Sequence, residues 1–164
     1  MDEILGNIYC WFESIFGQNF GEYLWGYNCA TQDFSGQNLF NSIGLITIGV
    51  TLVLVIAYYY LPFWGFNHPR TNRWWNWFAV LLVAGAINFL IAYSWTINDY
   101  LNGNIGDCLM YTRNSQGNII SQLIFQKDCW LFGLSNFFVS TIFFILWSGI
   151  LKWWSRNCKN SPVL

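Results

Sequence analysis

The sequence predicts an all-helical integral membrane protein with three membrane-crossing helices, an amphipathic helix near the N-terminus and a small hairpin-like loop. Three apolar windows, a shortage of charge and aromatic residues at the ends of the windows support this prediction. Lysine and arginine number 7, aspartate and glutamate 8, so charged residues make up 9% of 164 residues, against about a quarter in an ordinary soluble domain. A cytosolic enzyme is therefore disfavoured, because a soluble protein of this size needs more charge to cover its surface.

The predicted membrane helices are Asn41–Trp64, Trp74–Ile97 and Leu131–Trp154. The first two windows contain no charged residue, and the third contains only Lys152, close to its end. At 1.5 Å per residue, a helix of this length covers roughly 36 Å, which exceeds a hydrocarbon core of about 30 Å. The β-branched residues of the first window would suit a strand in water. A segment inside lipid must satisfy its own backbone hydrogen bonds, so we expect helices.

Aromatic residues mark the ends of the windows, as in the aromatic belts of membrane proteins. Tyrosine and tryptophan side chains have an apolar ring and a polar group, so they favour the membrane–water boundary. The alternative is an aromatic core in a soluble helical bundle, but such a bundle would place charge on one face of each helix. The flanking residues include Tyr58, Tyr59, Tyr60, Trp64, Trp74, Trp75, Trp95, Trp130, Trp153 and Trp154.

The basic residues predict that the N-terminus lies outside and the C-terminus in the cytoplasm, in a bacterial inner membrane or a plasma membrane. Residues 1–40 contain no lysine or arginine, and the long connection 98–130 contains only Arg113 and Lys127. The other basic residues lie in the connection 65–73, at the end of the third window and in the tail 155–164. With the single histidine, these predicted cytoplasmic anchors are His68, Arg70, Arg73, Lys152, Arg156 and Lys159.

His68 has two interpretations. It could contact a lipid head group or a ligand, or act as a pH-sensitive gate. We favour the simpler interpretation, in which a short turn broken by proline carries the basic residues that determine topology.

Four of the five cysteines fall on the predicted outer side, where disulfides form. We favour the pairs Cys10–Cys29, within the N-terminal segment, and Cys108–Cys129, across the long connection. The main competitor is a cross-pairing that joins the N-terminal segment to the long connection, and a further alternative is four free thiols. A zinc site is disfavoured because no CxxC pair occurs and His68 lies on the opposite side. The fifth cysteine, Cys158, is a candidate for acylation or a free thiol.

The two outer segments carry their own local patterns. Residues 2–16 place apolar residues at helical spacing until Gly17, which predicts an amphipathic helix in the outer interface, packed on its own spans or on a second copy. In the long connection, the β-prone runs 108–113 and 119–125 flank an Asn- and Gly-rich centre, which predicts a hairpin. The chain is thus one domain, with segments 1–40, 41–64, 65–73, 74–97, 98–130, 131–154 and 155–164.

Small and polar residues inside the windows are the candidate functional residues. Such residues let helices approach closely and form hydrogen bonds in lipid. Two interpretations stay open: packing of the three helices of one copy, or contacts between copies that include a water-filled axis. The candidates for helix contact or pore lining are Ala84, Asn88, Ala92, Gly133, Asn136, Ser140 and Ser148.

The windows carry no charged residue at mid-depth, which argues against proton-coupled transport and intramembrane proteolysis. No motif for a phosphate, a cofactor or a metal occurs, and the net charge of −1 argues against nucleic-acid binding. The first functional hypothesis is a homo-oligomer that is channel-like or perturbs the bilayer. The alternative is a non-catalytic accessory subunit that anchors or stabilises a larger membrane complex. A lipid-active enzyme is the weakest hypothesis, because a nucleophile–base pair is missing.

Overall fold

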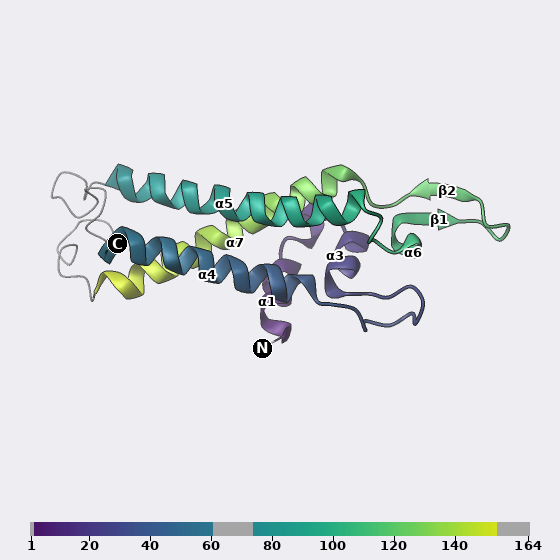
Figure 1. Ribbon diagram of the computed structural model, residues 1–164, viewed down its shortest axis with the longest axis horizontal. Helices are drawn as coiled ribbons and strands as arrows, with labels where there is room; N and C mark the ends of the chain where they lie inside the picture. Colours follow the sequence, from purple (N-terminus) through teal and green to yellow (C-terminus); the bar gives the residue numbers. More distant parts are fainter. Residues whose placement is uncertain (1, 61–73, 154–164) are drawn as a thin grey trace.

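A computed structural model describes residues 2–60 and 74–153 of the chain. Three long helices form an elongated bundle: α4 (Leu39–Tyr60), α5 (Trp74–Leu101) and α7 (Gln126–Lys152) (Figure 1). Each is long and apolar enough to cross a membrane, which confirms the three predicted helices. We call the end where α4 and α7 begin the hairpin end, and the end where they finish the tail end.

The long helices extend beyond the apolar windows at the hairpin end. Helix α5 continues to Leu101 rather than Ile97, and α7 begins at Gln126 rather than Leu131. The start of α7 is set by Asp128, whose carboxylate accepts a hydrogen bond of 2.8 Å from the backbone N–H of Phe125. Hydropathy alone misses these turns because a helix outside lipid can carry polar side chains.

The predicted cytoplasmic segments are covered only in part. Lys152 lies in the last turn of α7. The predictions for residues 61–73 and 154–164 lie outside the described residues, and they concern His68, Arg70, Arg73, Arg156, Cys158 and Lys159.

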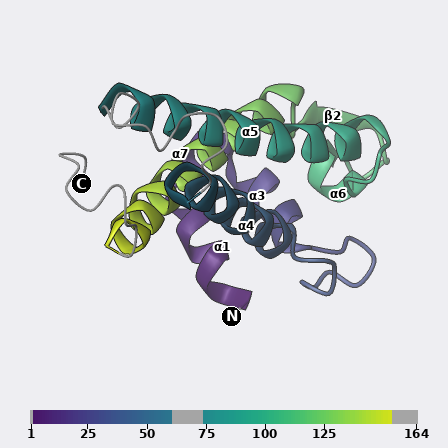
Figure 2. The same ribbon diagram turned by 60° about the vertical axis from the view of Figure 1, so that its left-hand side comes forward.

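The N-terminal segment is helical but is not the single predicted helix. It forms α1 (Asp2–Cys10), α2 (Glu13–Phe16) and α3 (Gln18–Trp25), with a turn at Trp11–Phe12. Tyr9, near the end of α1, is fully buried, whereas Trp11, in the turn, is 78% exposed. Helices α1 and α2 contact α4 and α7, so the segment lies against the hairpin-end half of the bundle (Figures 1 and 2).

Aromatic packing holds this segment to the bundle. Five buried rings, contributed by α1, α2, α3, α4 and α7, form one cluster with ring-centroid distances between 5.2 and 6.1 Å. Edge-to-face and offset contacts at these distances stabilise a core beyond the simple burial of area. The five rings are those of Tyr9, Phe16, Phe20, Phe40 and Phe132.

The predicted hairpin is confirmed, although residues 108–110 of its first expected run are helical rather than extended. Strands β1 (Tyr111–Arg113) and β2 (Ile119–Gln122) pair antiparallel, and Tyr111 lies opposite Gln122. In the turn, the side-chain Oδ1 of Asn114 accepts hydrogen bonds from two backbone N–H groups, and Gly117 adopts a φ of 83°. The hairpin projects beyond the ends of the long helices (Figure 1).

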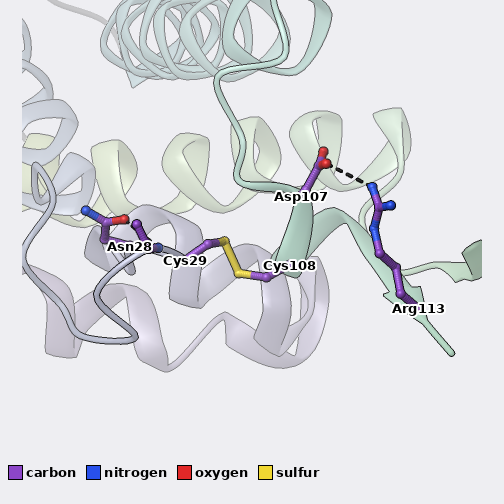
Figure 3. Close-up of a disulfide and its surroundings, with 6 residues drawn as sticks. Asn28, Cys29, Asp107, Cys108 and Arg113 are labelled. Atoms are coloured by element: carbon purple, nitrogen blue, oxygen red, sulfur yellow. Dashed lines mark hydrogen bonds and ion pairs between the residues drawn. A yellow bond between two sulfur atoms is a disulfide. The ribbon is translucent and has the colours of Figure 1, made fainter. Parts of the chain in front are cut away.

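One disulfide joins the N-terminal segment to the long connection, and the favoured pairings were wrong. Cys29 is bonded to Cys108 with a Cα–Cα distance of 5.9 Å, while Cys10 and Cys129 are free within the described part of the chain (Figure 3). The reason lies in the tertiary structure. Helix α6 (Asp107–Met110) packs against α3, which brings Cys108 to the residues that follow α3, whereas Cys129 is buried in the first part of α7.

An exposed ion pair lies next to this disulfide. The guanidinium of Arg113 is 2.9 Å from the carboxylate of Asp107, and both side chains are solvent-exposed (Figure 3). Exposed pairs contribute little to stability. The pair joins α6 to β1 within the long connection, so it does not link α6 to the N-terminal segment.

We predict that replacing either Cys29 or Cys108 with serine lowers the thermal unfolding midpoint of the protein in detergent by a similar amount. The disulfide closes a loop with a sequence separation of 79 residues. Loss of such a link removes about 2–4 kcal/mol of stability. Cys10→Ser is the control and should leave the midpoint unchanged. A peptide map under non-reducing conditions that shows Cys108 joined to Cys129 would contradict the assignment.

Candidate functional site

The polar residues inside the long helices come together in the interior of the bundle. Asn88, Asn136 and Ser140 have no solvent exposure, and neither do Thr47 and Thr51 of α4. With Tyr9 they form a connected group that we call the polar belt. Asn88 and Asn136 lie near the middle of α5 and α7, so the belt lies at mid-depth between the two ends of the bundle.

The carboxamide of Asn88 connects α5 to both other long helices. Its Nδ2 lies 3.1 Å from Oγ1 of Thr51 on α4 and 2.9 Å from Oγ of Ser140 on α7. The same nitrogen lies 3.0 Å from the carbonyl oxygen of Ala84, one turn earlier in α5. Two N–H groups therefore serve three acceptors, which fixes the orientation of the side chain.

Asn136 makes the second set of connections. Its Nδ2 donates to the backbone carbonyl of Asn88 at 2.8 Å. Its Oδ1 accepts two hydrogen bonds, from the hydroxyl of Thr47 at 3.1 Å and from the hydroxyl of Tyr9. One side chain of α7 thus contacts α1, α4 and α5 at once.

Glycines allow α5 and α7 to approach closely enough for these bonds. A Cβ added to Gly85 would lie 2.5 Å from the ring of Phe137, and one added to Gly133 would lie 3.0 Å from the ring of Phe89. Each glycine therefore receives an aromatic ring from the facing helix. This is the close packing that small residues permit between helices in lipid.

The remaining candidate residues from the sequence also lie in the interior of the bundle. Ala84 and Ala92 flank Asn88 on the buried face of α5, and both are fully buried. Ser148 lies toward the tail end, where it accepts a hydrogen bond of 3.2 Å from the indole Nε1 of Trp77. The structure therefore places all the candidates between the helices of one copy, which is one of the two interpretations left open by the sequence.

Thr47 and Thr51 lie one helical turn apart among the small and polar residues of the first apolar window, and the sequence already marks them as residues for helix contact. Tyr9 was missing from the candidate residues. Tyr9 lies four positions after Leu5 in the predicted amphipathic helix, so its helical face was also readable. Its contact with Asn136, 127 positions later in the chain, was not.

Two buried polar atoms have no hydrogen-bond partner among the described residues. They are Oδ1 of Asn88, in the polar belt, and Nε1 of Trp147, toward the tail end. Most buried polar groups in proteins are paired, so an exception needs an explanation. Oδ1 of Asn88 is an unpaired acceptor in the centre of the polar belt.

A second polar contact attaches α3 to α5 at the hairpin end. The hydroxyl of Tyr23 donates to Asp99 at 2.6 Å, and Nδ2 of Asn104 donates to the other carboxylate oxygen at 2.9 Å. Burial raises the pKa of Tyr23 above the ordinary value for tyrosine, and the hydrogen bond to Asp99 and its negative charge raise it further.

The belt consists of amides and hydroxyl groups. These groups exchange hydrogen bonds and hold helices together, but they form neither a nucleophile–base pair nor an anionic cage. Within residues 2–60 and 74–153, no group of three His, Cys, Asp or Glu side chains could hold a metal ion. The chemistry that the polar belt offers is hydrogen bonding in the buried interior of the bundle.

Comparison with protein-family models, with curated protein sequences and with solved structures finds no match to this chain. Its function must therefore be inferred from its own residues. The structure defines a class, a helical protein with three helices capable of crossing a membrane and a disulfide-linked layer at one end.

We predict that Asn136→Leu lowers the free energy of unfolding in detergent by about 2–3 kcal/mol, because it leaves the hydroxyl of Tyr9 and the carbonyl of Asn88 unpaired. The matched control is Asn98→Leu on the exposed surface of α5, which should cost less than about 0.5 kcal/mol. Equal effects of the two substitutions, measured by thermal or denaturant unfolding, would show that the polar belt does not stabilise the bundle.

The raised pKa of Tyr23 predicts a specific alkaline sensitivity. The folded protein retains the phenolic proton more strongly than the unfolded chain does. The stability from this contact is therefore complete below pH 10, the ordinary pKa of tyrosine, and is lost as the pH rises above it. Tyr23→Phe should be less stable at pH 8 but lose less stability between pH 8 and 11 than the parent. Parallel pH profiles of the unfolding midpoint would contradict this.

Proposed function

We propose that this protein is a non-catalytic integral membrane subunit that anchors or stabilises a larger membrane assembly. The observation that carries the proposal is the position of the polar belt. Its amides and hydroxyls bond the helices of one copy to each other, so they serve packing within the chain. A role in presenting a rigid framework to a partner fits this use better than a role in lining a pore.

The proposed orientation places the hairpin end outside the cell membrane and the tail end in the cytoplasm. The disulfide between Cys29 and Cys108 supports it, because disulfides persist on the oxidising side of a membrane. The basic residues of the sequence favour the same orientation. The N-terminal segment would then lie at the outer interface, with the exposed indole of Trp11 available to the lipid boundary.

The hairpin is the surface that we assign to the partner. Ile119 and Ile120 on β2 are 56% and 64% exposed, and the hairpin extends beyond the rest of the protein (Figure 1). A two-stranded hairpin is only marginally stable by itself in water, and exposed isoleucines add to the cost. Contact with the outer part of another membrane subunit would cover these side chains.

A homo-oligomer with channel-like activity is the second candidate function. The unpaired Oδ1 of Asn88 supports it, since a free acceptor in the centre of the belt is a site where water can enter. In this case copies would assemble through their lipid-facing surfaces, and a conformational change would hydrate the belt.

Two measurements on the intact protein separate these functions. The pure protein in liposomes should pass neither ions nor a small dye, and affinity purification from native membranes should return one other membrane protein at a fixed ratio. Ile119→Ser with Ile120→Ser should reduce recovery of this partner by about tenfold. Thr112→Ser, an exposed position on the neighbouring strand, is the control and should leave recovery unchanged.

Ion flux through the pure protein, abolished by Asn88→Leu, would reject the anchoring function in favour of the channel. Recovery of the protein without a partner, as a homo-oligomer that passes no ions, would reject both. An unchanged recovery of the partner with the Ile119 and Ile120 variant would reject the hairpin as the docking surface.

A further inference from the structure

Helix α1 closes the polar belt from the side of the bundle. It lies across α4, and a Cβ added to Gly44 of α4 would lie 3.1 Å from Cδ1 of Leu5 and 3.4 Å from the ring of Tyr9. The absence of a side chain at Gly44 lets α1 pack directly on α4. Tyr9 then reaches Asn136 and, with its fully buried ring, covers the hairpin-end side of the belt.

The attachments of the N-terminal segment are unequal. Helices α2 and α3 are held by the buried rings of Phe16 and Phe20, by the bond between Tyr23 and Asp99, and by the disulfide that follows α3. Helix α1 precedes the disulfide and the Tyr23 bond in the chain, and it is held by the ring of Tyr9 in the aromatic cluster and by Leu5 against Gly44. Among the described residues, the long-range side-chain hydrogen bond that α1 makes joins Tyr9 to Asn136.

A turn at Trp11–Phe12 separates α1 from the fixed part. This turn interrupts the helical hydrogen bonding, and Trp11 is exposed. Helix α1 has nine residues, which is too short to be stable without tertiary contacts. Next to Leu5, Gly6 of α1 lies directly against the indole ring of Trp25 on α3. The turn can therefore act as a hinge between a fixed α2–α3 unit and α1.

The belt below α1 would gain hydrogen bonds if water reached it. Oδ1 of Asn88 has no partner among the described residues, and it lies on the same side chain that bonds Thr51 and Ser140. When α1 leaves, Oδ1 of Asn136 and the hydroxyl of Thr47 become accessible as well. Hydrogen bonds from water to these atoms would offset part of the packing energy that is lost when Tyr9 leaves.

We propose that α1 is a movable plug: it swings about the Trp11–Phe12 turn, withdraws Tyr9 from between α4 and α7, and opens the polar belt to water from the hairpin end. The inference does not depend on the anchoring function, because either an anchor or a channel can contain such a device. It is a two-state element, with the Tyr9 contact favouring the closed state.

The test measures access of water to the belt. In protein lacking Cys10, Cys129 and Cys158, Thr47→Cys places one free thiol beneath α1, and a membrane-impermeant maleimide modifies it only when the belt is hydrated. We expect Tyr9→Ala to raise the modification rate by at least about tenfold, and Tyr9→Phe by about fivefold. The population of the open state increases as the contacts of Tyr9 with the bundle are removed. Both variants are compared with the Thr47→Cys protein.

Two controls separate plug movement from general loosening. Tyr60→Phe removes a tyrosine hydroxyl that donates to the carbonyl of Leu151 at the tail end, and it should leave the rate at Thr47→Cys unchanged. The substitution Ser148→Cys places a thiol at a buried position toward the tail end, and this thiol should stay unmodified in the Tyr9 variants. A Tyr9→Ala protein of native helicity whose rate stays within about twofold of the parent would overturn the proposal.

A covalent lock keeps the proposal testable if Tyr9→Ala does not fold. A Cβ at Gly44 would lie 3.4 Å from Cβ of Leu5, close to the usual disulfide separation of about 3.5–4.5 Å. Oxidised Leu5→Cys/Gly44→Cys protein should show amide hydrogen exchange in residues 43–51 that is at least about fivefold slower than in Leu5→Ser/Gly44→Ser. Equal exchange in the locked and serine proteins would overturn the proposal.

Discussion

The arrangement of the bundle depends on the pairing of one buried carboxamide. Asn136 exchanges hydrogen bonds with α1, α4 and α5, and each partner is itself buried. In an apolar medium water cannot replace a missing partner, so a polar group at this depth favours only those packings that satisfy it. Apolar surfaces alone would allow the helices to rotate and slide against each other with little change in energy. The polar belt therefore selects one rotation for each helix, and glycines and alanines on the same faces permit the necessary approach.

The N-terminal segment acts as a fourth layer that covers this bundle near the hairpin end. Its three short helices have little stability of their own, so their positions follow from tertiary contacts. Aromatic rings bury the segment against α4 and α7, Tyr23 ties it to Asp99, and Cys29 ties it to Cys108. The disulfide and the Tyr23–Asp99 bond follow the Trp11–Phe12 turn, whereas α1 is held by the packing of Tyr9 and Leu5 and by the Tyr9–Asn136 bond. The unequal attachment is the structural basis for treating α1 as a separate moving part.

The polar groups in the interior of the described bundle are amides and hydroxyls. A belt of such groups can bind helices to each other or can become hydrated when it is opened. The same groups serve either function, because a hydrogen bond between helices and a hydrogen bond to water have similar energies. What distinguishes an anchor from a channel is therefore the population of the hydrated state, together with the partner that covers the exposed hairpin.

The sequence by itself determined the three long helices, because apolar length and absence of charge are local properties of the chain that do not depend on folding partners. It also determined the hairpin, whose turn is organised by Asn114 and Gly117 within a few residues. The tertiary structure alone decided that Cys29 pairs with Cys108 and that Tyr9 meets Asn136, because both contacts join distant segments through the packing of α3 on α6 and of α1 on α4. Asn88 and Asn136 were recognisable as polar residues in apolar helices. Their partners were not, because the rotation of each helix about its axis is set by all its neighbours together.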